Sequence, residues 1–105
     1  MTNRICYQVT ATLPDETTAA SYIRWLQGGH VQAVIEGGAD RGMVVRLDQE
    51  QPGDAPRVRA EYEFPSRQAY DRYVETAAPA LREDGIRRFG SVPGVSFSRS
   101  LGEIL

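Results

Sequence analysis

Polar and apolar residues alternate with a period of two in four stretches of the chain, residues 4–13, 43–48, 57–64 and 95–101. Such alternation is typical of β-strands that bury one face and leave the other open. The third stretch has the cleanest pattern, so we expect it at the centre of a sheet. Its apolar phase is Val58, Ala60, Tyr62 and Phe64, and its polar phase is Arg57, Arg59, Glu61 and Glu63.

Two stretches with helical spacing lie between these strands. The first follows Pro14 and the acidic residues 15–16, which suit a helix N-terminus, and runs to about Gln27. The glycine pair 28–29 interrupts it, and one or two further turns then reach the glycine pair 37–38. This pattern predicts a broken helix.

The second helical stretch begins after Ser66, whose hydroxyl can cap a helix, and carries apolar residues at helical spacing as far as Ala77. Pro79 lies in the middle of the pattern, because apolar residues at helical spacing continue beyond it to Phe89. Proline cannot continue a helix without a kink. We therefore predict a kink or a restart at this position.

The order of elements is βαββαβ, which predicts one α+β domain over residues 1–105 with the ferredoxin-like arrangement. Right-handed crossovers would place both helices on one face of a four-stranded antiparallel sheet. Arg99 falls in the apolar phase of the last strand, so it needs a partner or a sheet edge. We expect the core to contain Tyr7, Val9, Val45, Ala60, Tyr62 and Phe97, and the opposite face to carry Cys6, Gln8, Thr10, Val44, Arg46, Arg59, Glu61, Ser96 and Ser98.

The polar face of this sheet is either wet or covered by another sheet. A small domain gains burial by closing that face and its edges against a second copy of itself, so we expect a two-fold homodimer. Arg46, Arg59, Glu61 and Glu63 would then pair across strands or subunits. In the alternative, a monomer, the same charges pair on a solvated face and contribute roughly 0.2–1 kcal/mol per pair.

The amino-acid composition argues against several classes of function. Twelve basic and fourteen acidic residues give a net charge of -2, so the protein has no positive electrostatic field that would attract nucleic acid or an anionic membrane. All of the basic residues are arginine. Cys6 is the single cysteine, so no internal disulfide can form. No leader or membrane-spanning stretch is apparent, and we expect a cytoplasmic protein.

The strongest candidate for chemistry is the segment Tyr22–Val31, which contains the only tryptophan, Trp25, and the only histidine, His30. An imidazole near neutral pKa beside aromatic rings could act as a general base. Alternatively, His30 could hydrogen-bond carbonyl groups at the helix end while Trp25 fills the core.

Tyrosines form a second candidate feature. Tyr7 and Tyr62 lie on strands predicted to be neighbours and would point into the space beneath the helices, where Tyr22, Tyr70 and Tyr73 could also contribute. Their hydroxyl groups could orient a planar ligand, although ordinary core packing explains them equally well. In contrast, the mixed charges at residues 82–88 look like a solvated helix face.

Sites for metals and nucleotide cofactors are not apparent. One histidine and one cysteine do not make a zinc site, and no glycine-rich phosphate-binding motif occurs. Some α+β folds bind haem between helix and sheet, and His30 could be its only protein ligand, but the spacing of residues in the sequence does not indicate haem binding. We predict no metal and no cofactor.

Three segments carry a resemblance to a known family: residues 22–35 with Trp25 and His30, residues 59–62, and residues 78–90. They resemble an uncharacterised bacterial domain-of-unknown-function family of the dimeric α+β-barrel superfamily, which includes antibiotic-biosynthesis monooxygenases. The resemblance implies a ferredoxin-like monomer, two sheets packed face to face in a dimer, and a pocket between sheet and helices. Relatives of that superfamily include cofactor-free monooxygenases, haem-degrading enzymes, lactone isomerases and proteins without known activity.

Three functions remain open at this stage. The first is a cofactor-free monooxygenase, cyclase or isomerase that acts on a small, partly aromatic substrate, with His30 as base and Trp25, Tyr7, Tyr62 and Tyr22 as walls. The second is a non-catalytic dimer that binds a small ligand in the same pocket. The third is a structural dimer with a filled core, and an open pocket that reaches His30 would favour the first two.

Overall fold

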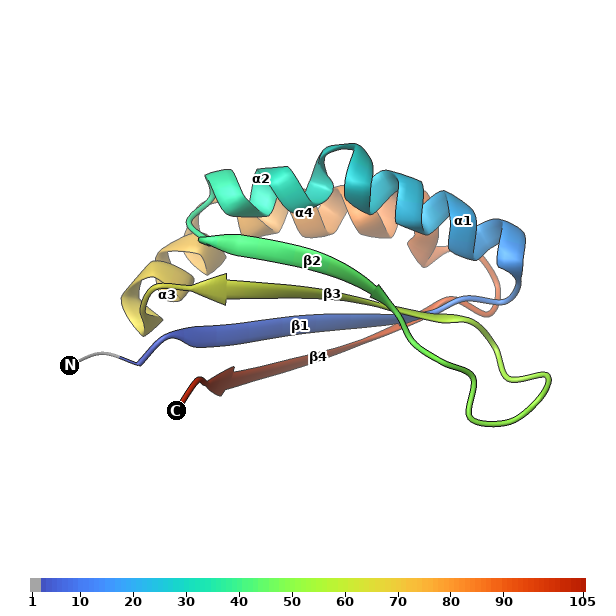
Figure 1. The fold of residues 1–105 in the computed structure, drawn as a ribbon. Coiled ribbons are helices and arrows are strands. Elements are labelled where there is room, and N and C mark those ends of the chain that lie inside the picture. The colour runs from blue at the N-terminus through green and yellow to red at the C-terminus, as the bar shows by residue number, and fades with distance from the viewer. Residues whose placement is uncertain (1–2) are drawn as a thin grey trace.

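The protein forms a four-stranded antiparallel sheet with helices on one face, here in a computed structural model that describes residues 3–105 (Figure 1). The strands have the order β2-β3-β1-β4, so β3 is central, as its alternation predicts. This arrangement confirms the ferredoxin-like α+β fold. The strands are β1 (Ile5–Thr12), β2 (Arg41–Arg46), β3 (Arg57–Phe64) and β4 (Ser96–Glu103).

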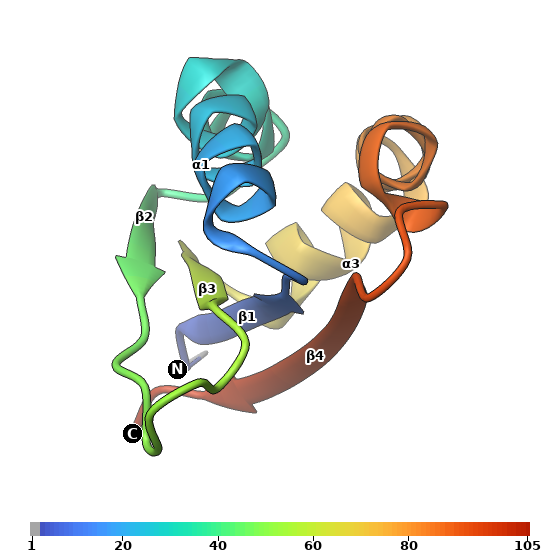
Figure 2. The same ribbon diagram turned by 90° about the vertical axis from the view of Figure 1, so that its right-hand side faces the viewer.

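Two helical segments connect the strands and lie on the same side of the sheet (Figure 2). The first contains α1 (Glu16–Trp25), a π-helical turn η1 (Leu26–His30) and α2 (Val31–Glu36). The second contains α3 (Arg67–Glu75), α4 (Ala78–Gly85) and a π-helical turn η2 (Ile86–Gly90).

Side chains cap α1 and α3 where the sequence indicates helix starts. The Asp15 carboxylate accepts a hydrogen bond from the Thr18 N–H at 2.7 Å, and the Ser66 hydroxyl accepts one from the Ala69 N–H at 3.1 Å. Each bond satisfies a backbone donor that has no partner within its helix. Pro79 lies in the first turn of α4, which confirms the predicted restart.

The predicted break in the first helix is a wide turn rather than a gap. The Val31 N–H donates to the Leu26 carbonyl, five residues earlier, and Gly29 has a positive φ of 148°. A side chain at such a φ is strained, whereas glycine has no Cβ and adopts this conformation readily. The turn therefore depends on Gly29, and it places His30 at the junction with α2.

The core lies between the sheet and the helices, and the central strands β1 and β3 and the helical segments all contribute buried side chains to it. Tyr7 pairs with Tyr62 in the register of β1 and β3, and Val9 pairs with Ala60. Tyr62 and Phe64 have exposed fractions of 2% and 0%. Burying a side chain of this size stabilises the fold by roughly 1.5–3 kcal/mol relative to leaving it exposed. The two central strands thus form the floor of the covered face, and the helical segments complete the core above it.

The predicted orientation of β2 is wrong. Val44 pairs with Ala60 and packs against the core, whereas Val45 pairs with Arg59 and faces the open side. Arg46 pairs with Val58, faces the helices and forms an ion pair with Glu16 at 2.6 Å. The reason is physical: residues 43–45 are all apolar, so the edge strand has no clean alternation to fix its phase.

The other predicted residues of the open face lie there. Gln8 donates to Glu61 at 2.6 Å and accepts a hydrogen bond from Ser100 at 3.2 Å. Arg59 lies 3.6 Å from Glu61, and Glu63 lies 3.5 Å from Arg4. The face is therefore polar and cross-linked from strand to strand. Within residues 3–105, no helix has both the length and the apolar character needed to span a bilayer.

Two neighbouring glycines offer a matched test of the turn. We expect Gly29→Ala to lower the free energy of unfolding by about 1–2 kcal/mol, because alanine is strained at a positive φ. Gly28→Ala should leave it unchanged or raise it by up to about 1 kcal/mol, because Gly28 has helical geometry and open space around its Cα. Urea denaturation of both variants measures the difference. Equal effects would contradict the role of Gly29.

Candidate functional site

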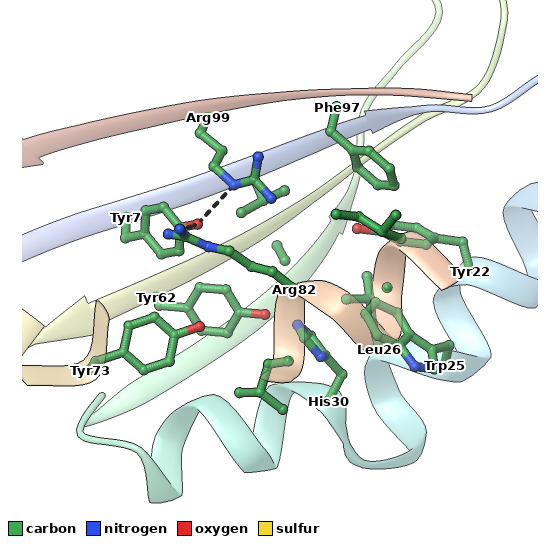
Figure 3. Close-up of a pocket in the computed structure, with 15 residues that line it drawn as sticks. Tyr7, Tyr22, Trp25, Leu26, His30, Tyr62, Tyr73, Arg82, Phe97 and Arg99 are labelled. Atoms are coloured by element: carbon green, nitrogen blue, oxygen red, sulfur yellow. Dashed lines mark hydrogen bonds between the residues drawn. The ribbon is translucent and has the colours of Figure 1, made fainter. Parts of the chain in front are cut away.

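A pocket opens between the covered face of the sheet and the helices (Figure 3). Its volume is about 530 Å³, counted out to the solvent at its mouth. The five residues expected as the base and the walls all line it: Tyr7, Tyr22, Trp25, His30 and Tyr62. Of the two further candidate tyrosines, Tyr73 lines the pocket and Tyr70 does not. Further lining residues are Val9, Leu26, Ala60, Tyr73, Leu81, Arg82, Gly85, Ile86, Phe97 and Arg99.

The rings of Trp25 and His30 stack on each other, with centroids 4.0 Å apart and planes inclined by 25°. The two residues are five positions apart in the chain, and the π-helical turn places one above the other. The Trp25 indole N–H donates to Asp84 on α4 at 3.0 Å. A Cβ at Gly85 would lie 3.0 Å from the indole, so this glycine leaves room for the ring. Trp25 is thus held from the opposite helix.

Burial determines the charge state of His30. The ring is half-buried, and this burial lowers its pKa from the ordinary value of 6.5, while the negative charge of Asp84 acts in the opposite direction. The neutral imidazole, which can accept a proton, is therefore favoured at neutral pH. No hydrogen bond to the His30 ring from any residue in the range 3–105 was found, so the predicted contact with helix-end carbonyls is not formed.

The tyrosines place hydroxyl groups around the same space. Burial raises the pKa of Tyr22 and of Tyr73 to about 12, and it also raises the pKa of Tyr62. These phenols therefore stay protonated and can donate hydrogen bonds. The Tyr62 hydroxyl is buried and has no hydrogen-bond partner among residues 3–105. Buried polar atoms nearly always have a partner, so this one is available to a bound molecule or to water.

Two arginines also reach into the pocket. Arg99 Nε on β4 donates to the Tyr7 hydroxyl at 3.1 Å, and an Arg82 guanidinium nitrogen on α4 lies 3.5 Å from the same oxygen (Figure 3). The sequence flags Arg99 through its place in the apolar phase of β4, and the structure gives it both a partner and an edge strand.

The interpretation of Arg82 as part of a solvated helix face is wrong. Its neighbours Arg87 and Arg88 do bind Asp84 on the exposed side of the helix, at 2.8 and 3.1 Å. Arg82 points inward instead, and nothing in the local charge pattern separates it from them. Asp84 also differs from the prediction, since it fixes Trp25. The hydrogen bonds from Trp25 and Arg87 lower the pKa of this carboxyl group.

The residues of the pocket suit an organic molecule better than a metal. Within residues 3–105, no three side chains of the His, Cys, Asp or Glu types come together as metal ligands. Aromatic rings, hydroxyl groups and guanidinium groups line the pocket. Such a lining can enclose a planar molecule and hydrogen-bond its oxygen atoms.

Comparison with solved structures gives the class of the protein. An EthD family protein from Bacillus halodurans superimposes with a TM-score of 0.73 at 13% identity, over 97% of this chain and 99% of that one. A dimeric ferredoxin-like protein from an uncultured marine organism gives 0.71 at 17% identity, over 98% and 96%. SnoaB, a cofactor-independent oxygenase from Streptomyces nogalater, gives 0.67 at 9% identity, over 97% and 93%. These are ferredoxin-like α+β proteins, and the likeness establishes the fold.

Comparison with protein-family models assigns the chain to a narrower group than the fold class. A family model described as a domain of unknown function, DUF4286, matches residues 4–104. The chain therefore belongs to the DUF4286 family, in agreement with the resemblance to a domain-of-unknown-function family noted in its sequence. No curated protein matches the chain.

The burial of His30 predicts its titration. We expect a pKa below 6.5 in the folded protein, and we expect Trp25→Ala to raise it towards 6.5 because the indole covers the ring. Since the unfolded chain takes up this proton more readily, the free energy of unfolding should fall as the pH drops below 6.5. An NMR titration of the single histidine of the untagged protein measures the pKa. A value at or above 6.5 in the unmodified protein would contradict the argument.

Proposed function

We propose that this DUF4286 protein binds a small, partly aromatic molecule in the pocket and removes a proton from an activated carbon of it, with His30 as the base. The observation that supports this most is the stacking of a half-buried imidazole with a lowered pKa on Trp25 inside an open pocket. An enzyme of this kind would be a cofactor-free monooxygenase, cyclase or isomerase. The open pocket also argues against a purely structural role with a filled core.

The chemistry needs few groups. His30 takes the proton from a carbon next to a carbonyl group and becomes imidazolium, while the electron pair of the C–H bond moves to the carbonyl oxygen as an enolate. The buried Tyr62 hydroxyl, which has no partner, is suited to donate to that oxygen. Asp84 assists indirectly: it holds Trp25, and its charge favours the imidazolium form. Return of the imidazolium proton to a different carbon of the enolate would give an isomerase. Addition of molecular oxygen to the enolate carbon, with the imidazolium proton passing to the terminal peroxide oxygen, would begin a monooxygenase reaction.

Proton exchange tests the base directly. We expect the protein to accelerate exchange of the activated hydrogens of benzoylacetone or anthrone for deuterium under anaerobic conditions, followed by NMR. His30→Gln should lower the catalysed rate by roughly 100- to 10,000-fold, since general bases contribute about that much. Binding of the same ketone should change little, because glutamine retains much of the size of the ring.

The matched control is Gln32→Ala on the exposed side of α2, which should exchange at the normal rate. An unchanged exchange rate in His30→Gln would refute the role of His30 as the base. The rate of the unmodified protein should also decrease as the pH falls below the pKa of His30, since the imidazolium form cannot accept a proton.

One observation favours a second candidate, a non-catalytic binding protein. Catalytic histidines are commonly oriented by a hydrogen bond from the second ring nitrogen to a carboxylate or carbonyl group. No such bond to His30 is formed by residues 3–105. Binding of the aromatic ketones without any accelerated exchange would favour this candidate.

We also propose that the chain forms a homodimer through the open face of its sheet. That face carries hydrogen-bonded polar side chains on both central strands and the apolar residues Met43 and Val45 on β2. Met43 has an exposed fraction of 44%. The marine ferredoxin-like protein with the same fold is described as dimeric. Packing two such faces would bury surface that a small domain otherwise leaves open.

Sedimentation analysis tests the dimer. We expect the unmodified chain to sediment at about twice its mass of 11.6 kDa. Thr10→Glu should give a folded monomer. The new carboxylate would lie beside Arg59 in the sheet, so the fold tolerates it, but in a dimer it would be buried in the middle of the interface at a large cost in free energy. Thr17→Glu on the exposed side of α1 serves as the control and should remain dimeric. A single 11.6 kDa species for the unmodified chain would refute the proposal.

A further inference from the structure

Two positive charges meet at one end of the pocket without a negative group to balance them. Arg99 and Arg82 approach the same Tyr7 oxygen, at 3.1 and 3.5 Å. The pocket lining contains no aspartate or glutamate. Within residues 3–105, neither arginine takes part in an ion pair.

This lack of a partner sets the two arginines apart from most others in the chain. Arg4, Arg41, Arg46, Arg57, Arg59, Arg67, Arg87 and Arg88 all lie within 4.0 Å of a carboxylate oxygen. The remaining two, Arg24 and Arg72, lie on exposed helix surfaces, where water solvates the charge. Arg99 is also exposed, but its Nε donates to the Tyr7 hydroxyl, and Arg82, which approaches the same oxygen, is half-buried. Two guanidinium groups at one hydroxyl oxygen repel each other. An anion between them would remove this repulsion.

Buried donors without partners point to the same ligand. The Tyr62 hydroxyl and the Arg82 Nε are buried and have no hydrogen-bond partner among residues 3–105. Tyr62 has an exposed fraction of 2%. Both groups line the pocket, and both donate hydrogen bonds to oxygen. A ligand with acceptor oxygens would satisfy them, whereas a hydrocarbon would leave them without partners.

The rest of the lining restricts the shape of the ligand. In Figure 3 the two guanidinium groups lie beside Tyr7, while Tyr22, Trp25 and Phe97 supply rings further along the pocket. Guanidinium groups match the two coplanar oxygens of a carboxylate, and aromatic walls favour a flat, apolar body.

We propose that the pocket recognises a planar aromatic carboxylate, with the carboxylate between Arg82 and Arg99 and the ring extending towards Trp25. This deepens the proposed function and rests on it, because it names the class of molecule that would be bound in front of His30. The carboxylate would fix the position of the molecule, and the reacting carbon would lie on the end of the molecule that is closer to the His30 imidazole.

Cinnamate and its neutral amide, cinnamamide, are matched probes that differ in charge and have nearly the same shape. We expect cinnamate to bind the untagged protein at least tenfold more tightly in isothermal titration calorimetry. The indole N–H resonance of Trp25, the only tryptophan, should shift with either probe and so locate the binding in this pocket.

Variants separate the pocket arginines from general charge attraction. Arg99→Gln should weaken cinnamate binding by about 10- to 100-fold, the usual effect of losing a charged hydrogen bond, and should weaken cinnamamide binding much less, because the amide carries no charge. Arg99→Lys keeps the charge but loses the planar fork, so its affinity should be intermediate. Arg72→Gln makes the same change in charge on the exposed side of α3 and should have no effect. Arg82→Gln, checked by thermal unfolding, should repeat the result of Arg99→Gln.

The outcomes distinguish this inference from the proposed function. Equal affinities for cinnamate and cinnamamide would overturn the carboxylate assignment and leave the aromatic pocket in place. An equal loss of affinity in Arg72→Gln and Arg99→Gln would overturn it as well, since general charge would then explain the binding. If neither probe bound or shifted the Trp25 resonance at millimolar concentration, both the assignment and the proposed aromatic ligand would be wrong.

Discussion

Tyrosine hydroxyl groups cannot be buried dry without a large cost in free energy, and this constraint determines how the protein is built under its helices. The central strands place Tyr7 and Tyr62 side by side on the covered face, and α3 adds Tyr73 above them. A core of leucine or valine at these positions could close completely. Phenols bring polar groups into it, and the space left around them becomes a pocket with its own hydrogen-bond donors.

Much of the fold could be predicted because several local signals agree. The alternation of β1 and β3 is clean, and their register follows it residue by residue. The glycine pair at 28–29 and the proline at 79 mark helix interruptions through their backbone chemistry alone, and the structure breaks its helices at both. Arg99 is a further case. A charged residue in the apolar phase of a strand predicts a polar partner on the covered face, and that partner is the Tyr7 hydroxyl.

The failures share a different cause: they depend on contacts between segments far apart in sequence. The phase of β2 is set by its pairing with β3, and three consecutive apolar residues carry no information about it. Arg82 on α4 and Arg87 on η2 lie in the same charged run, yet the first points towards Tyr7 and the second towards solvent. The hydrogen bond from Trp25 to Asp84 joins residues 59 positions apart, and no local sequence pattern predicts it.

The wide turn η1 gives the first helix two parts that can change independently. An α-helix advances by about 100° per residue, so inserting or removing one residue in a regular helix would rotate everything beyond it away from the sheet. Here the extra residue is absorbed at an exposed glycine, and Val34 still reaches the core. A one-residue insertion or deletion at this turn would therefore change the segment beside the imidazole and preserve the packing of α2.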